Sequence, residues 1–394
     1  KWEFIGWAFP EIPHEAVEWV RSHADGKGAT NIWAPYIIPF GDKYRLYYCV
    51  SAFGLKTSYI GLAESASPEG PWMQRGCVVK TDATSVMNAI DPSIIADSAT
   101  GKWWMHYGSF FGGLYCVELN PETGLPVQEG DQGHLIARRA TYWKDNLEAP
   151  EIIYNPELKQ YYLFVSYDPL MTTYNVRVGR SDKAEGPFVD YFGVELKDTT
   201  NNFPILTAPY RFNNHPGWAG TAHCAVFTSD EGQYFMAHQG RLSPHNQMMD
   251  LHLRQVFFTS DGWPVVSPER YTGSASRKFS AADIVGEWEI IRVQEPAYER
   301  QLQAGQILWG EGQLKNEEWN VSCTLSLKKD GQLDENKGYW KFAERGQLLS
   351  LTLNGESVDN LLVFAGHDWE NETETVLFTG LDSRGRSVWG KRTK

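Results

Sequence analysis

The first two thirds of the chain repeat one pattern of apolar and polar positions. Each copy places two isoleucines two residues after a proline, and the copies are Ala34-Pro35-Tyr36-Ile37-Ile38, Asp91-Pro92-Ser93-Ile94-Ile95 and Ala149-Pro150-Glu151-Ile152-Ile153. The prolines lie 57 and 58 residues apart, and each copy is followed by a turn and an aromatic, strand-like run, at residues 44–48, 103–107 and 161–165. A repeat at this period indicates one structural unit used several times.

Each unit is long enough for four strands joined by short turns, which is typical of one blade of a β-propeller. A second internal repeat points the same way, because an alternating run followed by a Gly-Pro turn occurs at residues 59–72 and again at 176–188. A fourth unit opens at Gly220 and has its aromatic strand at residues 234–238. Since it starts later than one period after the third copy, we expect an insertion around Thr199 to Trp218.

The chain opens inside such a unit. We interpret Lys1 to Val20 as the tail of a preceding blade, and one period counted back from Pro35 places the innermost strand of that blade about 22 residues upstream of the numbering. The sequence therefore predicts an all-β fold, with a five-bladed propeller over residues 1–273 whose first blade is incomplete in this chain.

A second domain is predicted after the propeller. The composition changes after residue 268, and residues 274–283 read as a linker. Short alternating runs separated by turns then predict a small antiparallel β-barrel or sandwich over residues 284–394, with strands at 286–291, 322–327, 348–353 and 375–380. Its opening, Gly286-Glu287-Trp288, resembles the start of a lipocalin-like barrel. We expect this domain to pack against the propeller rather than to bind sugar.

Composition and charge narrow the function. A net charge of -13 argues against a nucleic acid or an anionic membrane as partner, and a neutral ligand fits better. The five cysteines show no CxxC spacing, so we expect buried, apolar thiols rather than a zinc site or a disulfide framework. The chain has no run of 18 apolar residues, so the sequence predicts no membrane-spanning helix. We also expect the protein to be a monomer.

Two carboxylates occupy the repeats where chemistry is expected. Asp91 begins the second copy, and Glu148 lies just before the third. Because the innermost strands of all blades line one axial channel, equivalent positions converge on a single pocket. Hydrolysis of a glycosidic bond usually needs two carboxyl groups with different protonation states. The alternative is that both are strand-end residues bonded to backbone amides.

Several motifs together resemble the arabinanase branch of glycoside hydrolase family 43. They span about Lys1 to Tyr271 in family order and comprise Ile32-Trp33-Ala34-Pro35, residues 47–54, Asn88-Ala89-Ile90-Asp91-Pro92, residues 108–113 and Glu148-Ala149-Pro150. The resemblance implies a five-bladed propeller that cleaves arabinose- or xylose-containing polysaccharides with inversion. It implies that Glu148 is the general acid and that Asp91 orients this acid and tunes its pKa. The general base of the family would lie upstream of Lys1, so we expect this chain alone to be inactive or severely impaired.

The resemblance also implies a metal ion, and the chain differs from the family pattern at a few positions. It places His223 in the central channel beside calcium or another hard cation, although the neighbouring residues Ala222 and Cys224 do not match the family. A satisfied core histidine is the alternative. Family members often carry Asp where this chain has Tyr36, which leaves the exact sugar open.

Sugar contacts are expected from flat aromatic faces and from polar groups near the two carboxylates. Trp33 and Phe111 are the first candidates, although blade packing accounts for most aromatic residues in any propeller. The predicted substrate-binding residues are Trp33, Phe53, Asn88, Ser109, Phe111 and His238. Phe110 stays at even odds between sugar contact and packing, and Arg254 is either a polar substrate contact or part of a surface salt bridge.

Three functions remain after these steps. The leading one is an inverting hydrolase of α-1,5-arabinan or its oligosaccharides, or an exo-acting arabinofuranosidase or xylosidase of the same family. The second is a non-catalytic glycan-binding propeller that lacks the base. The third, a retaining fructoside hydrolase, expects Arg-Asp-Pro and Glu-Cys, whereas this chain has Ile90-Asp91-Pro92 and Glu148-Ala149. A polysaccharide substrate implies a secreted, periplasmic or cell-surface protein.

Overall fold

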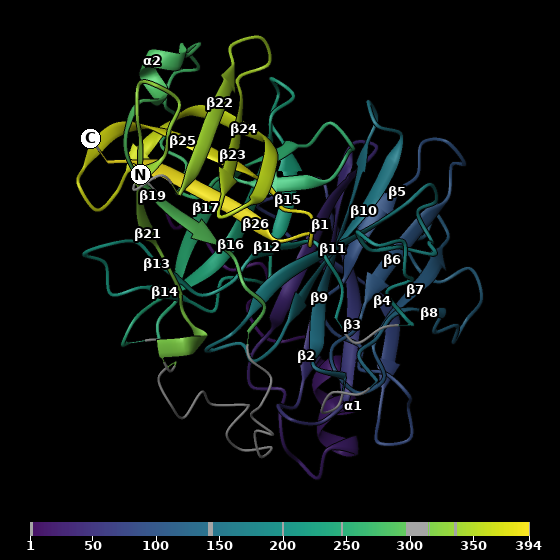
Figure 1. Cartoon of the computed structure of the whole chain (residues 1–394). Helices are drawn as coiled ribbons and strands as arrows, with labels where there is room; N and C mark the ends of the chain where they lie inside the picture. The colour runs from purple at the N-terminus through teal and green to yellow at the C-terminus, as the bar shows by residue number, and fades with distance from the viewer. Residues whose placement is uncertain are drawn as a thin grey trace. The chain divides into compact units, whose positions relative to one another are not determined.

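The computed structural model describes residues 3–140, 145–198, 201–245, 247–296, 314, 316–334 and 337–393. Its contacts group the chain into two compact units, which we treat separately. Unit 1 comprises Lys1–Val165, Arg180–Val189 and Gly193–Asn201, and unit 2 comprises Ser166–Gly179, Asp190–Phe192 and Asn202–Lys394. Strands dominate both units (Figure 1).

The repeats form three four-stranded sheets, each at the position predicted for a blade. The first has the order β1-β2-β3-β4, the second β5-β6-β7-β8 and the third β12-β11-β10-β9. Proline opens the repeat at a place where its missing N–H costs no ladder hydrogen bond, and the aromatic runs form the second strand of each sheet. The bounds are β1 Trp33–Phe40, β2 Lys43–Ser51, β3 Ser58–Ser65, β4 Met73–Thr81, β5 Ser93–Ala96, β6 Trp103–Tyr107, β7 Leu114–Leu119, β8 His134–Ala137, β9 Leu147–Asn155, β10 Gln160–Tyr167, β11 Asn175–Ser181 and β12 Ile205–Thr207.

The start of the chain differs from the interpretation as a blade tail. Residues His14–His23 form helix α1, which buries Ala16 and Val20 in a cluster with Val50 of β2 and Tyr59 of β3. Alanine and valine four residues apart lie on one helical face, and that spacing favours a helix over a strand. The prediction failed because we read this segment only by its place in the repeat.

The fourth repeat lies in unit 2, in a seven-stranded sheet. Its path is β18-β17-β16-β14-β13-β20, and β15 pairs with β16. The predicted opening and aromatic strand of this repeat correspond to β15 and β16, and the predicted insertion contains β12, β13 and the start of β14. The bounds are β13 Tyr210–Arg211, β14 Trp218–Ala219, β15 Ala225–Thr228, β16 Tyr234–Leu242, β17 Asp250–Phe258, β18 Pro264–Val266 and β20 Asn320–Val321.

The C-terminal segment of unit 2 forms an antiparallel seven-stranded sheet, in the order β21-β19-β26-β25-β24-β23-β22. All four strands predicted there are present. Trp288, Trp340 and Phe378 lie in the buried core of this sheet. The bounds are β19 Gly286–Arg292, β21 Cys323–Leu327, β22 Gly338–Ala343, β23 Leu348–Leu353, β24 Glu356–Asp368, β25 Thr373–Leu381 and β26 Ser387–Arg392, with helix α2 at Ala281–Ile284 and the 3-10 helix η2 at Asn316–Glu318.

All five cysteines are free thiols, in agreement with their spacing. Cys49, Cys116 and Cys224 are buried as expected, but Cys77 is half-buried and Cys323 is exposed. The expectation of buried thiols is therefore wrong for Cys323, where β21 turns this side of the strand to solvent. No helix within the described residues combines the length and the apolar character needed to cross a membrane.

Gly61 of β3 tests the packing of the first sheet. It is paired with Tyr48, whose ring covers the glycine, and a Cβ at residue 61 would lie 2.3 Å from Cζ of that ring. We expect Gly61→Ala to lower the free energy of unfolding by about 1–3 kcal/mol, because the buried ring must move. Chemical denaturation of both proteins measures this.

Gly41→Ala is the matched control. Its Cβ would meet nothing within 4 Å, so only the φ of 58° opposes it, at a cost of about 1 kcal/mol. An equal or smaller loss at Gly61 than at Gly41 contradicts the close packing of Tyr48 on β3.

Candidate active site

The backbone has the same unusual conformation at one position of three successive repeats. Asp91, Ala149 and His223 have φ values of 56°, 53° and 52°. A left-handed conformation costs a non-glycine residue about 1–2 kcal/mol. Such strain persists where the surrounding structure enforces it, and it is common at functional sites. The second, third and fourth repeats therefore share a strained backbone position, and the first two of these residues lie in unit 1.

Asp91 and Glu148 are brought together by this turn. Asp91 is 7% exposed, and its carboxyl group accepts a hydrogen bond from the amide of Ala149, the residue after Glu148. Burial and the neighbouring charge of Glu148 raise the pKa of Asp91 well above its usual range. The charge of Glu148 is thus close enough to disfavour the ionised form of Asp91. The structure thus supplies the paired carboxyl groups that the repeat predicted.

Ser109 holds the side chain of Glu148. The Ser109 hydroxyl donates to Oε2 of Glu148 at 2.7 Å, and the two residues also form a backbone bridge. The amide of the next residue, Phe110, donates to the carbonyl of Leu147 at 2.8 Å. Ser109 is 4% exposed, so water does not compete freely for this hydrogen bond. The predicted role of Ser109 is substrate contact, whereas in the structure its hydroxyl donates to a carboxylate of the protein.

The turn at residues 108–113 is shaped by strain and by one aspartate. Phe110 and Phe111 have φ values of 51° and 39°, and three glycines of the turn also have positive φ. Asp145 accepts a hydrogen bond from the amide of Gly112 at 2.9 Å and pairs with Arg138 at 3.2 Å. These contacts fix the turn beside Glu148 and leave the ring of Phe111 half-buried.

A third carboxylate, Glu151, lies directly after the proline of its repeat, at the position that Tyr36 and Ser93 occupy in the other two copies. Ser93 donates to Oε2 of Glu151 at 2.7 Å and accepts from the amide of Ile152 at 3.1 Å. Tyr36 hydrogen-bonds Ser93, and burial together with the charge of Glu151 raises the Tyr36 pKa. Tyr36, Ser93 and Glu151 thus occupy the same position of three repeats and interact with one another. Sequence reasoning missed Glu151, although the alignment of the three repeats contains the signal.

Two predicted aromatic residues lie side by side. The ring centroids of Trp33 and Phe53 are 6.2 Å apart, and Phe53 is 47% exposed. Trp33 is half-buried and belongs to the same repeat position that carries Glu148 two repeats later. An exposed pair of flat apolar faces beside strand ends is suited to stacking on sugar rings.

Comparison with known proteins identifies the family. The profile of glycosyl hydrolases family 43 matches residues 13–264, and that of a C-terminal lipocalin-like domain matches residues 268–390. The chain belongs to glycosyl hydrolase family 43.

Relatives of known name agree with this family. The extracellular endo-α-(1→5)-L-arabinanase of Thermotoga petrophila is 29% identical over 96% of this chain and 82% of its own length. The extracellular exo-α-(1→5)-L-arabinofuranosidase ArbA of Cellvibrio japonicus is 31% identical over 70% of this chain and 80% of its own length. The crystal structure of the T. petrophila endo-1,5-α-L-arabinanase in complex with TRIS matches with a TM-score of 0.83 at 27% identity, covering 100% of this chain and 91% of that chain.

Two predicted contact residues of this family-43 chain are engaged inside the protein. Asn88 is 3% exposed and accepts a hydrogen bond from Ser58 at 2.6 Å. His238 is 1% exposed, and its Nε2 accepts from Nε of Arg254 at 2.9 Å. Their roles as sugar ligands stay predictions that these contacts do not favour. The surface salt bridge considered for Arg254 is wrong, because Arg254 is fully buried and donates to the carbonyls of Ser267 and Pro268.

His223, the predicted cation ligand, lies in unit 2 and is half-buried. Its amide donates to Oγ of Ser166 at 2.9 Å. Within the described ranges, the one group of at least three potential metal-ligating side chains does not include His223. Hard cations prefer several oxygen ligands, so a single imidazole does not make a calcium site. The described residues do not fit a protein-made site there, and calcium stays a prediction.

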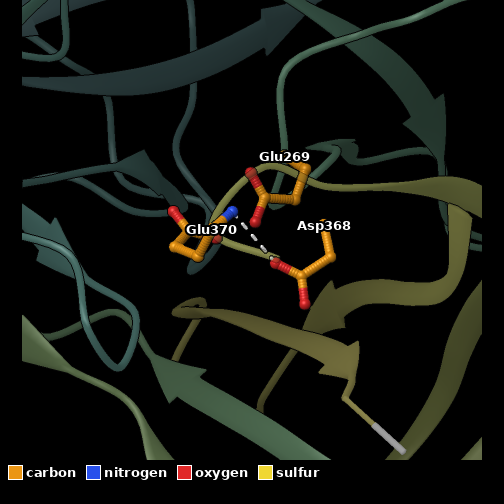
Figure 2. A group of neighbouring side chains, drawn as sticks. All are labelled: Glu269, Asp368 and Glu370. Atoms are coloured by element: carbon orange, nitrogen blue, oxygen red, sulfur yellow. Dashed lines mark hydrogen bonds between the residues drawn. The ribbon is translucent and has the colours of Figure 1, made fainter. Parts of the chain in front are cut away.

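The group with metal-like spacing lies elsewhere in unit 2 and consists of Glu269, Asp368 and Glu370, whose ligand atoms are within 4.8 Å of one another (Figure 2). The ammonium of Lys391 already pairs with all three, at 3.0 Å from Glu269, 2.9 Å from Asp368 and in direct contact with Glu370. Burial raises the pKa of Glu269 to about 8, against the opposing effect of Lys391. We conclude that a lysine provides the cation of this cluster.

The charge of Asp91 makes stability depend on pH. The folded state keeps the proton of Asp91 to higher pH than the unfolded state, whose pKa is near 3.8, so the free energy of unfolding falls as pH rises above that value. Asp91→Asn removes this ionisation and still accepts the Ala149 hydrogen bond. We therefore expect the stability of the variant relative to the wild type to be higher at pH 8 than at pH 4. Denaturation of both proteins at the two pH values measures this difference.

Asp82→Asn is the control with the opposite sign. Hydrogen bonds from Thr84 and Ser85 lower the pKa of Asp82, so its loss should destabilise the protein above pH 4. A stability difference for Asp91→Asn that does not change with pH contradicts the buried pair.

Lys391→Met tests the cation of the cluster. It leaves three carboxylates around an apolar side chain, and losing one partner of a buried ion pair costs about 3–5 kcal/mol. The Lys391 side chain is 0% exposed, whereas Lys102, in a single pair with Glu118, is 48% exposed. Lys102→Met should therefore cost less than about 1 kcal/mol. Denaturation curves that show equal losses for both variants argue against the arrangement.

Proposed function

We propose that this protein is an inverting glycoside hydrolase that acts on α-1,5-arabinan or its oligosaccharides. The observation that carries the proposal is the pairing of the buried Asp91 with the half-buried Glu148, linked by the hydrogen bond from the Ala149 amide to Asp91. Membership of glycosyl hydrolase family 43 and the arabinanase and arabinofuranosidase names of the relatives support the substrate class. The relatives are named extracellular enzymes, which supports export of this protein to its polysaccharide.

Glu148 is the proposed general acid. It gives its proton to the glycosidic oxygen as the bond from the anomeric carbon to that oxygen breaks. Asp91 is the proposed residue that orients this acid and tunes its pKa, because it holds the backbone of Ala149 and the two carboxyl groups repel each other when both are ionised. An aspartate upstream of Lys1, on the innermost strand of the first of five blades, is the proposed general base that accepts a proton from the attacking water.

The exposed pair of Trp33 and Phe53 and the half-buried ring of Phe111 are the proposed platforms for sugar faces. The relatives include both an endo-acting arabinanase and an exo-acting arabinofuranosidase, so internal cleavage and release from the chain end are the two modes to compare. The sizes of the first products distinguish these modes: a ladder of oligosaccharides supports internal cleavage, and one short product supports release from the end.

The function is tested with linear α-1,5-arabinan on this chain and on the same chain extended upstream of Lys1, called here the extended protein. We expect the extended protein to release sugar whose anomeric configuration is inverted, as followed by NMR, and this chain to be at least 100-fold slower. Equal rates contradict the upstream base. Binding of arabinan without hydrolysis by the extended protein supports a glycan-binding propeller instead.

Glu148→Gln in the extended protein should lower the rate on arabinan by about 100- to 10,000-fold, because glutamine donates no proton to the leaving oxygen. Glu118→Gln, which alters a partly exposed carboxylate paired with Lys102, is the control and should keep the rate. An unchanged rate for Glu148→Gln excludes this residue as the acid.

A further inference from the structure

We propose that Ser109 is a positioning residue that selects which oxygen of Glu148 carries the catalytic proton. This inference rests on the proposed function of Glu148 as general acid. The hydroxyl of the buried Ser109 donates to Oε2 of the half-buried Glu148 at 2.7 Å, so Oε2 is occupied as an acceptor. The proton of the acid then resides on Oε1, and Oε1–H is the bond that breaks when the leaving oxygen is protonated.

The hydrogen bond also changes in strength along the reaction. A hydroxyl bonded to an ionised carboxylate forms a stronger hydrogen bond than one bonded to a neutral acid. Ser109 therefore stabilises the carboxylate that remains after Glu148 has given up its proton. Asp91 lies beside the same carboxyl group, and the two groups repel each other when both are ionised.

The position of Ser109 is held independently of its side chain. Its neighbours in the turn are tied to the strand that carries Glu148, through the amide of Phe110 on the carbonyl of Leu147 at 2.8 Å and the amide of Gly112 on Asp145 at 2.9 Å. The bond of Phe110 to Leu147 belongs to the antiparallel backbone bridge between Ser109 and Glu148. Removing the hydroxyl alone should thus leave the turn in place, and the role of the hydroxyl becomes separable from folding.

The chain contains a matched pair with another partner. Ser93 donates to Oε2 of Glu151 at 2.7 Å, and both Ser93 and Glu151 are buried, at 1% and 5% exposed. This pair has the geometry of Ser109 and Glu148 but lies on the other side of the strained turn, three residues along the repeat from the acid. Ser93→Ala removes the same kind of hydrogen bond without touching Glu148.

The experiment compares leaving groups in the extended protein. Ser109→Ala should slow hydrolysis of arabinan by about 10- to 100-fold, because an alkoxide must be protonated to leave. An arabino-oligosaccharide with a 2,4-dinitrophenyl leaving group needs no such proton, so its kcat should change less than about 3-fold. The basic limb of the pH profile on arabinan should move upward by about one unit, because the ionised acid loses a charge-assisted donor. Ser109→Thr keeps a hydroxyl and should restore most of the arabinan rate.

Each outcome separates the inference from its alternatives. A similar loss on both substrates with Ser109→Ala assigns Ser109 a structural or substrate-binding role and overturns the proposal. A loss of rate on arabinan alone in the Ser93→Ala variant also overturns the proposal. We expect Ser93→Ala to change the rates on both substrates equally or to change neither. If the wild-type extended protein cleaves neither substrate, the proposed function itself fails, and that result is distinguishable because no variant is needed to observe it.

Discussion

The site depends on holding two carboxyl groups close together in a buried position where they repel each other. Such a pair is unfavourable to folding, since burial already penalises each charge and the neighbour adds to the penalty. The scaffold resists this repulsion by backbone geometry. A left-handed residue at the same position of successive repeats turns the chain, and the amide of Ala149 is bonded to the carboxyl group of Asp91. The family-43 fold thus stores strain where chemistry is proposed, as functional sites often do.

A second acidic cluster shows how the same protein handles buried charge without such strain. Around Lys391, three carboxylates converge as closely as metal ligands do, but the ammonium lies among them and balances part of their charge. Glu269 follows the last strand of the fourth repeat, whereas Asp368 and Lys391 belong to the C-terminal sheet. The cluster therefore links segments more than 90 residues apart in sequence within unit 2. The pair of Asp91 and Glu148 is proposed to be reactive, whereas Lys391 balances part of the charge of the other group, which is structural.

The repeat predicted most of the strands because proline, isoleucine and aromatic residues recur with a fixed period, and that information is local. It also placed Asp91 and Glu148 at positions that converge. It did not predict helix α1, where the order of the repeat was weighed above the spacing of Ala16 and Val20. The partners of Asn88 and His238 were equally inaccessible, because each is bonded to a residue on another strand. A polar side chain in a motif looks the same in sequence whether it faces a ligand or a buried neighbour.

The sequence by itself determined the all-β class, the repeated four-stranded unit, the family and the two carboxylates, since all of these follow from periodic patterns and short motifs. The tertiary structure alone decided which groups touch. It assigned Ser109 to Glu148 and Ser93 to Glu151, and it gave the acidic cluster a lysine for its cation. The physical reason is that hydrogen bonds and ion pairs depend on separations of a few ångströms between distant strands. Spacing along the chain specifies the strand, but the packing of strands specifies the partner.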